Sequence, residues 1–262
     1  MNKDFKSINM IGDIFVDLLA SNINVLPLWG TDTLSKIKII PGGSALNAST
    51  HATNFVKLKN YPIKVNLFSS LGDDIFSSLI KNHLNSHFVN DFTAQIPSKS
   101  TGSCIVLSNR SDRSFITDRG VVDDLTLSYF NLDDLLSSDH IHIAGYYNCS
   151  SLKNDLPEFL KIASDKGKSI SLNPQFDASN KWDGIFEIAP YLTFLICNTS
   201  ELMSITKSEN IDSSCEIILN LGCKYVIVTK GEQGADAYYY SNVDGENKIS
   251  VISQSSFIAN VI

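Results

Sequence analysis

The chain has 262 residues and a formal net charge of −7, with 43% hydrophobic and 19% charged residues. This composition is typical of a globular protein, and the negative charge argues against a surface that binds the phosphate backbone of nucleic acids. Asp13 and Asp17 interrupt the N-terminal apolar run, so no secretory signal is expected. No apolar stretch is as long as the about 18 residues that a membrane span needs. The five cysteines form no C-x-x-C pair, which favours free thiols in a reducing compartment. We therefore expect a cytoplasmic protein, with no membrane or nucleic-acid partner.

Short apolar runs alternate with amphipathic stretches along the chain. The apolar runs predict strands at 8–17, 63–72, 140–147, 168–174, 192–198 and 223–231. The amphipathic stretches predict helices at 44–58, 73–84, 152–165, 199–206 and 212–221. Strands that alternate with helices predict an α/β fold with a mainly parallel sheet and helices on both faces.

Two segments, near 15–40 and 88–120, lack a helical stripe and are rich in polar and β-forming residues. We interpret them as strand insertions that form a small sheet over one edge of a single domain spanning 1–262.

The stretch PGGSALNAST is the most informative part of the sequence. Gly42 and Gly43 open a helix whose first turns carry small side chains, so its N–H groups could approach a ligand closely. Asn47, one turn further, can both donate and accept hydrogen bonds. Asp17, at the end of the first predicted strand, suits the binding of two sugar hydroxyls. The alternatives are a tight turn before a packed helix for the glycines, and a turn or capping residue for Asp17.

Two further motifs follow predicted strands, where open α/β sheets bind ligands. In NTSE, Asn198 and Glu201 form either a helix capping box or oxygen ligands near nucleotide phosphates and hydrated Mg²⁺. In VTKGEQGA, Thr229, Gly231 and Gly234 form either a nucleotide cradle or a hairpin turn. Both alternatives remain open for each motif.

These pieces, taken in order, resemble the PfkB (ribokinase-like) family of carbohydrate and nucleoside kinases. The resemblance rests on IGDIFVD, PGGSALNAS, SSLGDDIFSSL, SLNP, NTSE and VIVTKGEQGA, and on TGSCIVL with DRSFITDRG in the expected lid. Ser77 departs from the family pattern, because it replaces the last glycine of G-x-D-x-x-G. The resemblance implies a three-layer αβα fold with a mainly parallel sheet and a small β lid.

By the same resemblance, the protein transfers the γ-phosphate of ATP to a primary hydroxyl of a sugar or nucleoside. Mg²⁺ is the implied metal, and a monovalent cation is a further cofactor open to the family. Asp17, Gly42, Gly43 and Asn47 would bind the substrate. Asn198, Glu201, Thr229, Gly231 and Gly234 would face ATP, with Glu201 reaching the metal through water. The lid would pair two subunits into a homodimer.

The last residues, SFIANVI, resemble the family strand that leads into D-T-x-G-A-G-D, whose final aspartate is the catalytic base. The resemblance therefore implies that the base lies beyond Ile262, that the C-terminal part of the domain is missing, and that the 262-residue chain has almost no kinase activity. The alternative is a naturally short relative that binds a sugar or nucleoside, or dimerises through its lid, without catalysis. An unrelated nucleotide-binding enzyme ranks last, because no G-x-G-x-x-G follows the first strand.

Overall fold

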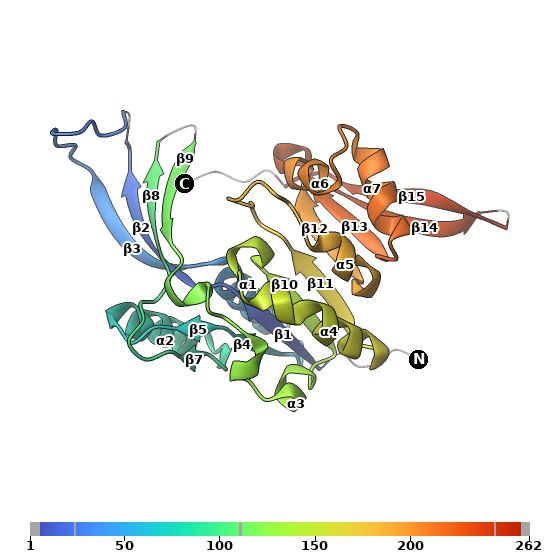
Figure 1. The fold of residues 1–262 in the computed structure, drawn as a ribbon, viewed down its shortest axis with the longest axis horizontal. Coiled ribbons are helices and arrows are strands. Elements are labelled where there is room, and N and C mark those ends of the chain that lie inside the picture. The colour runs from blue at the N-terminus through green and yellow to red at the C-terminus, as the bar shows by residue number, and fades with distance from the viewer. Residues whose placement is uncertain (1–5, 24, 110–111, 244, 258–262) are drawn as a thin grey trace.

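A nine-stranded sheet forms the body of the protein in a computed structural model that describes residues 6–23, 25–109, 112–243 and 245–257. The strand order is β15-β14-β13-β12-β11-β10-β1-β4-β6 (Figure 1). All pairs from β6 to β13 are parallel, and β14 and β15 add an antiparallel hairpin. The strands are β1 (Ser7–Gly12), β4 (Lys64–Phe68), β6 (Asn90–Asp91), β10 (His140–Ala144), β11 (Ser169–Asn173), β12 (Phe194–Asn198), β13 (Tyr225–Thr229), β14 (Ala235–Val243) and β15 (Glu246–Gln254).

Helices cover both faces of this sheet. Successive residues of a strand point to opposite faces, so neighbours in β1 pack against different helices. Met10 of β1 packs in a core with Leu46 and Ile80, from α1 and α2. Its neighbour Ile11 packs in a second core, with residues such as Leu156 of α4. The helices are α1 (Ser44–Leu58), α2 (Ile75–His87), α3 (Leu132–Leu135), α4 (Leu152–Asp165), α5 (Ile185–Ile188), α6 (Thr199–Thr206) and α7 (Ile211–Asn220). Short 3₁₀ turns are η1 (Gly120–Val122), η2 (Leu127–Tyr129), η3 (Tyr146–Asn148), η4 (Ala189–Tyr191) and η5 (Gly231–Gln233). Among the helices described, none is long and apolar enough to cross a membrane.

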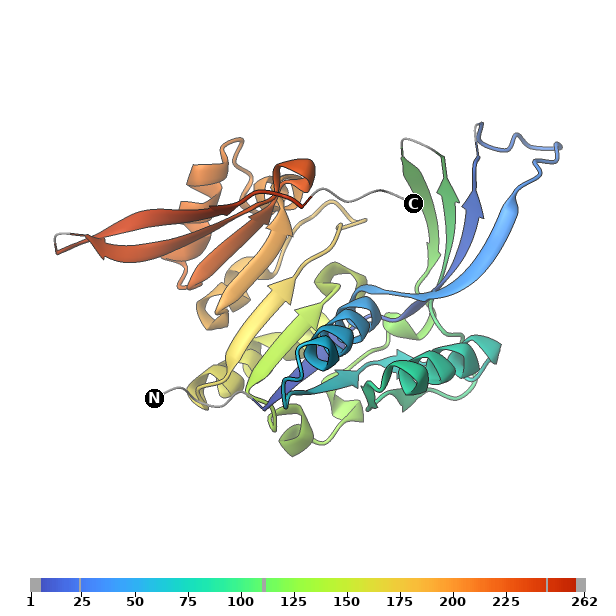
Figure 2. The ribbon, with the colours of Figure 1, turned by 180° about the vertical axis from the view of Figure 1, so that it is seen from behind.

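One part of the sheet carries helices on a single face only. On the side of α1 and α2, no helix of the described ranges lies over β12, β13 and β14 (Figure 2). Phe194, Tyr225 and Tyr239 form a row of rings there, with centroids 5.2 Å apart for the first pair and 5.6 Å for the second. Tyr225 is 37% exposed. This face of the protein is therefore apolar and open.

A second sheet of four strands projects from the body and forms the lid (Figure 1). Its order is β3-β2-β8-β9, and its strands are β2 (Phe15–Ser21), β3 (Lys36–Gly42), β8 (Ser103–Ser108) and β9 (Arg113–Asp118). Within 88–120, the earlier strands β6 and β7 (Ala94–Gln95) pair instead with β4 and with β5 (Ser70–Leu71). Only the later part of that range lies in the lid sheet.

The helices predicted at 44–58 and 199–206 are confirmed as α1 and α6 with the predicted bounds. The single strand predicted at 8–17 is wrong, because the chain leaves the body sheet after Gly12 and re-forms a strand in the lid. Asp17 therefore lies inside β2 rather than at the end of the first strand. The strand predicted at 63–72 is also divided, into β4 and β5. The strand expected from Phe257 onward lies, from residue 258, outside the described residues.

Two glycines of the turn between β13 and β14 should differ sharply in their tolerance of a side chain. Both have positive φ, 57° for Gly231 and 93° for Gly234. A Cβ on Gly231 would meet open space, whereas one on Gly234 would overlap the carbonyl oxygen of Gln254 in β15. We expect Gly234→Ala to lower the free energy of unfolding by about 2 kcal/mol more than Gly231→Ala, measured by urea denaturation. Equal losses would show that β15 does not pack as described.

Candidate functional site

The turn before α1 brings two predicted substrate residues together. Gly43 has φ 96°, and a Cβ there would lie 2.8 Å from the carbonyl oxygen of Asp13 and the backbone nitrogen of Phe15. A Cβ on Gly42 would overlap the carboxylate of Asp17. Position 43 therefore requires glycine for its positive φ and its close backbone packing, whereas a side chain at position 42 would displace the carboxylate of Asp17.

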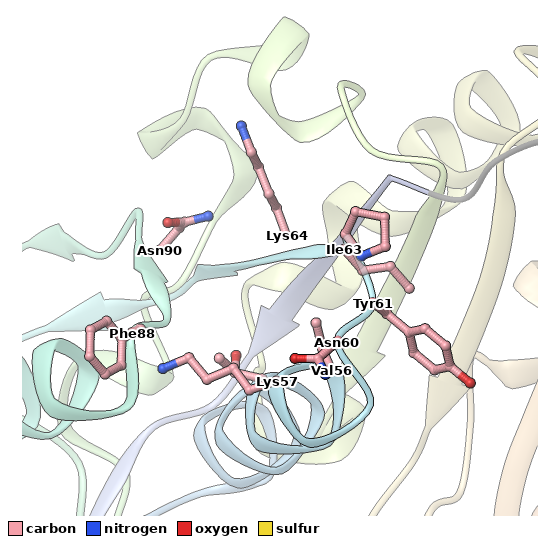
Figure 3. A pocket seen from close by; sticks show the side chains of 10 residues that line it. Val56, Lys57, Asn60, Tyr61, Ile63, Lys64, Phe88 and Asn90 are labelled. Atoms are coloured by element: carbon pink, nitrogen blue, oxygen red, sulfur yellow. The ribbon is translucent and has the colours of Figure 1, made fainter.

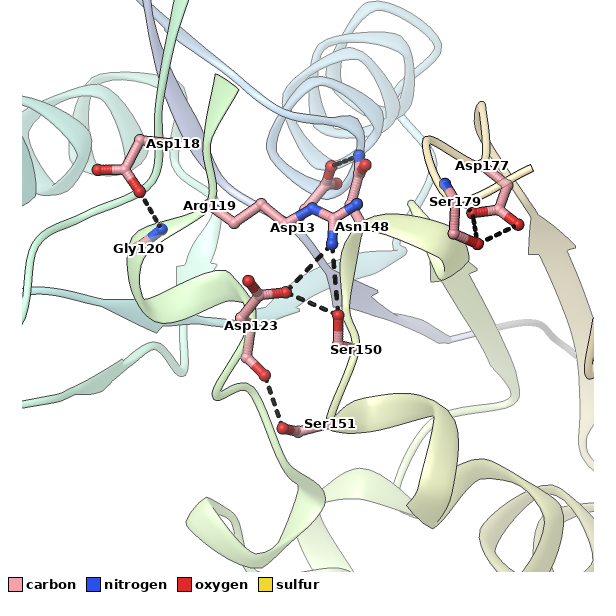
Figure 4. A network of polar contacts seen from close by, with 10 residues as sticks. All are labelled: Asp13, Asp118, Arg119, Gly120, Asp123, Asn148, Ser150, Ser151, Asp177 and Ser179. Atoms are coloured by element: carbon pink, nitrogen blue, oxygen red, sulfur yellow. Dashed lines mark hydrogen bonds and ion pairs between the residues drawn. The ribbon is translucent and has the colours of Figure 1, made fainter. Parts of the chain in front are cut away.

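The N-terminus of α1 binds a carboxylate from Asp13, which lies in the connection between β1 and β2. One oxygen of Asp13 accepts the backbone N–H groups of Ser44, at 2.7 Å, and Ala45, at 3.2 Å, and the other accepts the side-chain amide of Asn148 at 2.7 Å (Figure 4). Asp13 is 1% exposed, and this burial raises the pKa of its carboxyl group although the hydrogen bonds oppose the rise. The expectation that these helix N–H groups face a ligand is therefore wrong for Ser44 and Ala45.

Asp17 and Asn47 keep their side-chain polar groups free. Asp17 is partly buried, and no donor within the described ranges bonds to its carboxylate. Burial raises the pKa of Asp17, and the nearby Asp13 carboxylate raises it further. Asn47 is exposed, its backbone N–H donates to Gly43 at 3.0 Å, and its side-chain amide bonds to no described residue. A carboxylate acceptor and an amide at the junction of lid and body are the groups that a polyol needs.

Three polar residues near this junction were not identified from the sequence. They are Asp13, Asn148 and Arg119, whose guanidinium donates to Asp123 and to Ser150, both at 3.4 Å (Figure 4). Asp13 and Asn148 could have been found from their positions, because they follow the ends of the adjacent strands β1 and β10, where ligands bind. Arg119 had no such signal, since it follows a lid strand.

The predicted nucleotide residues gather at the ends of two neighbouring strands. Asn198 ends β12 and lies opposite Thr229, which ends β13. The side-chain oxygen of Asn198 accepts the N–H of Glu201 at 2.9 Å, and a Glu201 carboxylate oxygen accepts the N–H of Asn198 at 3.0 Å. The capping-box alternative is thus realised. Glu201 is 9% exposed, and burial raises the pKa of its carboxyl group. Its second oxygen has no partner among the described residues.

Gly231 and Gly234 lie in the turn that joins β13 to β14. Lys230 donates its backbone N–H to the carbonyl of Gly234 at 2.8 Å, and the two strands are antiparallel. The hairpin alternative is thus realised as well. Contacts of Thr229, Gly231 and Gly234 with a nucleotide stay a prediction.

Both groups of residues lie at the carboxyl edge of the body sheet. β10 and β11 separate β1 from β12, so the strand ends are three steps, or about 14 Å, apart. Ligands of open α/β sheets bind along this edge. The arrangement places the polar groups of Asp17 and Asn47 and those of Asn198 and Glu201 along one edge of the sheet, with the lid standing over the first pair.

Comparison with known proteins places this architecture in a family. Residues 9–256, nearly the whole chain, match the family described as pfkB family carbohydrate kinase. The chain therefore belongs to the pfkB family, which confirms the sequence-based assignment. Among curated proteins it is similar to the adenosine kinase of Dictyostelium discoideum, 26% identical over 191 residues, and to that of Saccharomyces cerevisiae, 23% identical over 182 residues. These matches cover 71% and 68% of this chain but 55% and 52% of the relatives, so the chain spans about half their length.

Solved structures confirm the ribokinase-like α/β fold. A ribokinase from Giardia lamblia superposes with a TM-score of 0.80 at 17% identity, over 98% of this chain and 78% of that one. The adenosine kinase from Sinorhizobium meliloti gives 0.77 at 16% identity, over 99% and 82%. An Arabidopsis thaliana ribokinase, solved with ribose and ATP, gives 0.73 at 18% identity, over 97% and 78%.

The buried Asp13 should leave a signature in the pH dependence of stability. Because the pKa of Asp13 is raised in the folded protein, its protonated form stabilises the fold below the unfolded pKa of about 3.9, and this contribution is lost as the pH rises through the folded value. Asp13→Asn cannot titrate. We expect the free energy of unfolding of the wild type to fall, relative to the variant, as the pH increases from about 4, measured by chemical denaturation at a series of pH values. A relative increase over that window would contradict the burial of this carboxylate.

Proposed function

We propose that this protein binds a sugar or nucleoside through Asp17, Gly42, Gly43 and Asn47, for phosphorylation of a primary hydroxyl by ATP. The observation that carries the proposal is the Asp17 carboxylate, partly buried yet without a donor in the described part of the chain. A partly buried carboxylate has lost part of its hydration, and a pair of substrate hydroxyls would donate hydrogen bonds to it. Family membership supplies the reaction class, and the curated relatives named as adenosine kinases support a nucleoside as the first substrate to test.

The lid surface above Asp17 supports a substrate with an apolar part. Across the lid strands, Asp17 lies opposite Cys104, and Cys104 opposite Thr117. Asp17, Cys104 and Thr117 thus form one row across the lid. Two residues further along the strands, on the same face, a second row carries mainly apolar side chains. That row consists of Lys38, Leu19, Val106 and Phe115. Because the rows are about 7 Å apart, hydroxyls at Asp17 would place a base attached to the same ribose beside the apolar row.

The nucleotide would lie at the ends of β12 and β13. We propose that Asn198, Glu201, Thr229, Gly231 and Gly234 contact ATP. Asn198 and Thr229 end β12 and β13, and the other three residues follow these strand ends by two to five positions, which supports the proposal. No group of three His, Cys, Asp or Glu in the described ranges could hold a metal. Mg²⁺ keeps most of its water and phosphate ligands in nucleotide sites, so the unpaired Glu201 oxygen fits an indirect role through water. Phosphate-bound Mg²⁺ would supply charge neutralisation at the transferring group.

The catalytic base is assigned to no described residue. Its predicted place beyond Ile262, and the low activity expected of the 262-residue chain, stay predictions. Binding without transfer is the second candidate, and it rests on the same free Asp17. ATP-dependent phosphorylation of a bound substrate, followed by mass spectrometry of the product, separates the two candidates.

The outer face of the lid supports pairing of two copies. Leu18 lies opposite Ile39 and Ile105, and Ile105 opposite Ile116, so one apolar row crosses all four strands. This row is on the face away from Asp17. Ile39, Ile105 and Ile116 are 53%, 43% and 62% exposed. We propose a homodimer through this row, and a cytoplasmic location in keeping with five buried free cysteines.

Removal of the Asp17 charge tests the substrate site. Asp17→Asn keeps the shape but removes the strongest acceptor, so we expect at least about tenfold weaker binding of adenosine or ribose, since hydrogen bonds to charged groups contribute about 1.5–3 kcal/mol. Isothermal titration calorimetry measures the effect. Asp32→Asn, at an exposed lid-loop carboxylate, is the matched control and should change nothing. Unchanged affinity of Asp17→Asn would remove this residue from the site.

A charge in the apolar lid row tests the dimer. Ile116→Lys would place an ammonium in the proposed contact, where its desolvation is unfavourable. We expect sedimentation velocity to show a dimer for the wild type and a monomer for the variant. Val251→Lys, at a position of β15 that is 47% exposed, should leave the dimer intact. A monomeric wild type would contradict the proposal.

A further inference from the structure

Two histidines lie one turn apart on α2. His83 and His87 are four residues apart in this helix, so their side chains lie on one face of it. Their ring centroids are 4.4 Å apart, with an interplanar angle of 37°. Both side chains are partly buried. Neither histidine is among the proposed substrate or nucleotide residues, so the pair requires an explanation of its own.

Each of the two rings contacts an oxygen atom of the neighbouring helix α1. Nε2 of His83 lies 3.0 Å from the hydroxyl oxygen of Thr50, and Nδ1 of His87 lies 3.5 Å from the amide oxygen of Asn54. An amide oxygen only accepts hydrogen bonds, so Nδ1 of His87 carries the proton and Nε2 keeps its lone pair. Nδ1 of His83 and Nε2 of His87 have no hydrogen-bond partner among the described residues. Metal-binding histidines typically have one ring nitrogen held by such an oxygen, which leaves the other for the metal.

The helices that carry these four residues are fixed beside each other. Leu46 of α1 and Ile80 of α2 pack in the same core. At the other end of α1, the Lys57 ammonium extends towards the Phe88 ring and lies 3.2 Å from its centroid (Figure 3). Phe88 directly follows His87, the last residue of α2. With the backbone fixed, the two rings need only rotate about their own side-chain bonds to reach a common ion, and this rotation is soft.

The spacing of the two rings favours some metal ions over others. A metal bound about 2.1 Å from one nitrogen of each ring would lie about 3.2 Å from both centroids. Centroids 4.4 Å apart then subtend an angle of about 90° at the metal. The tetrahedral geometry of zinc would need centroids about 5.2 Å apart. A right angle between two nitrogens is instead typical of the square-planar and tetragonal sites of nickel and copper, which imidazole suits as a ligand.

The other histidines of the chain offer no comparable pair. His51 is exposed on α1, and no described imidazole contacts its ring. Both ring nitrogens of His140 are engaged by the hydroxyls of Ser169 and Ser171, each at 2.7 Å. Since no group of three His, Cys, Asp or Glu occurs in the described ranges, water would complete the coordination of an ion on α2.

We propose that His83 and His87 bind a divalent nickel or copper ion through the ring nitrogens that α1 leaves free. The carboxyl end of α2 supports a cation there, because the last carbonyl groups of a helix carry partial negative charge. The Lys57 ammonium opposes it, whereas the net charge of −7 on the whole chain attracts cations. This site is separate from the proposed substrate and nucleotide residues and does not depend on the proposed function.

Chlorides of nickel, zinc and magnesium are the probes, titrated by calorimetry into the full chain without an affinity tag. At pH 7.5 a histidine with the ordinary pKa of about 6.5 is neutral and can bind a metal. We expect one Ni²⁺ per chain, bound more tightly than Zn²⁺, and no binding of Mg²⁺ on α2, because Mg²⁺ requires oxygen ligands. His83→Gln and His87→Gln should each weaken Ni²⁺ binding at least about tenfold, since the loss of a residue that only orients a ligand already costs about 10- to 100-fold.

Asn54→Asp should strengthen the site. A carboxylate in place of the amide would hold the His87 ring more firmly and add a negative charge, so we expect Ni²⁺ binding about fivefold tighter, the effect of one charge pair of about 1 kcal/mol. His51→Gln is the matched control, since it removes an exposed imidazole from the neighbouring helix. It should change the affinity less than twofold.

The proposal is overturned if the wild type binds no Ni²⁺ below about 1 mM, if His51→Gln weakens binding as much as His83→Gln, or if neither variant of α2 has an effect. Tighter binding of Zn²⁺ than of Ni²⁺ would contradict the right angle between the two nitrogens. Unchanged affinity of Asn54→Asp would contradict the orienting contact from α1.

Discussion

The hydrogen bonds of the buried Asp13 carboxylate are the constraint on which the site depends. Burying a carboxylate is costly unless donors surround it, and here two α1 N–H groups and the Asn148 amide do so. These bonds fasten the end of β1, the start of α1 and the turn after β10 to one another. Because the chain leaves the body sheet at this point, Asp17 enters the lid and meets Gly42. The position of the predicted substrate residues thus follows from a residue that need not touch substrate itself.

The alternation of side chains along β2 separates two roles of the lid. Asp17 faces Gly42 and carries the polar chemistry, whereas Leu18, one residue later, faces the other way within an apolar row. A single sheet can therefore cover a ligand on one face and meet another protein surface on the other.

The sequence predicted the α/β class, the parallel sheet and the helix at 44–58, because hydrophobic periodicity reports which residues are buried. It failed at 8–17, where the apolar run continues across a change of sheet. That break is made by the tertiary bonds of Asp13, which no local pattern records. Motifs placed Asn198 and Glu201 correctly at a strand end, yet could not decide between a cap and a ligand. The structure realises the cap, and the free Glu201 oxygen leaves room for both roles.

The open face of the body sheet has a consequence for the behaviour of this protein in solution. His140 and His142 of β10 lie beside it on the same side of the sheet, hydrogen-bonded to the hydroxyls of Ser169 and Ser171, and burial lowers the pKa of both to about 4. The face therefore gains no charge on mild acidification that could keep molecules apart. Apolar association is strengthened by kosmotropic salts such as sulfate. The type of salt should thus influence solubility most near the isoelectric point of about 5.2, where the net charge that otherwise keeps molecules apart disappears.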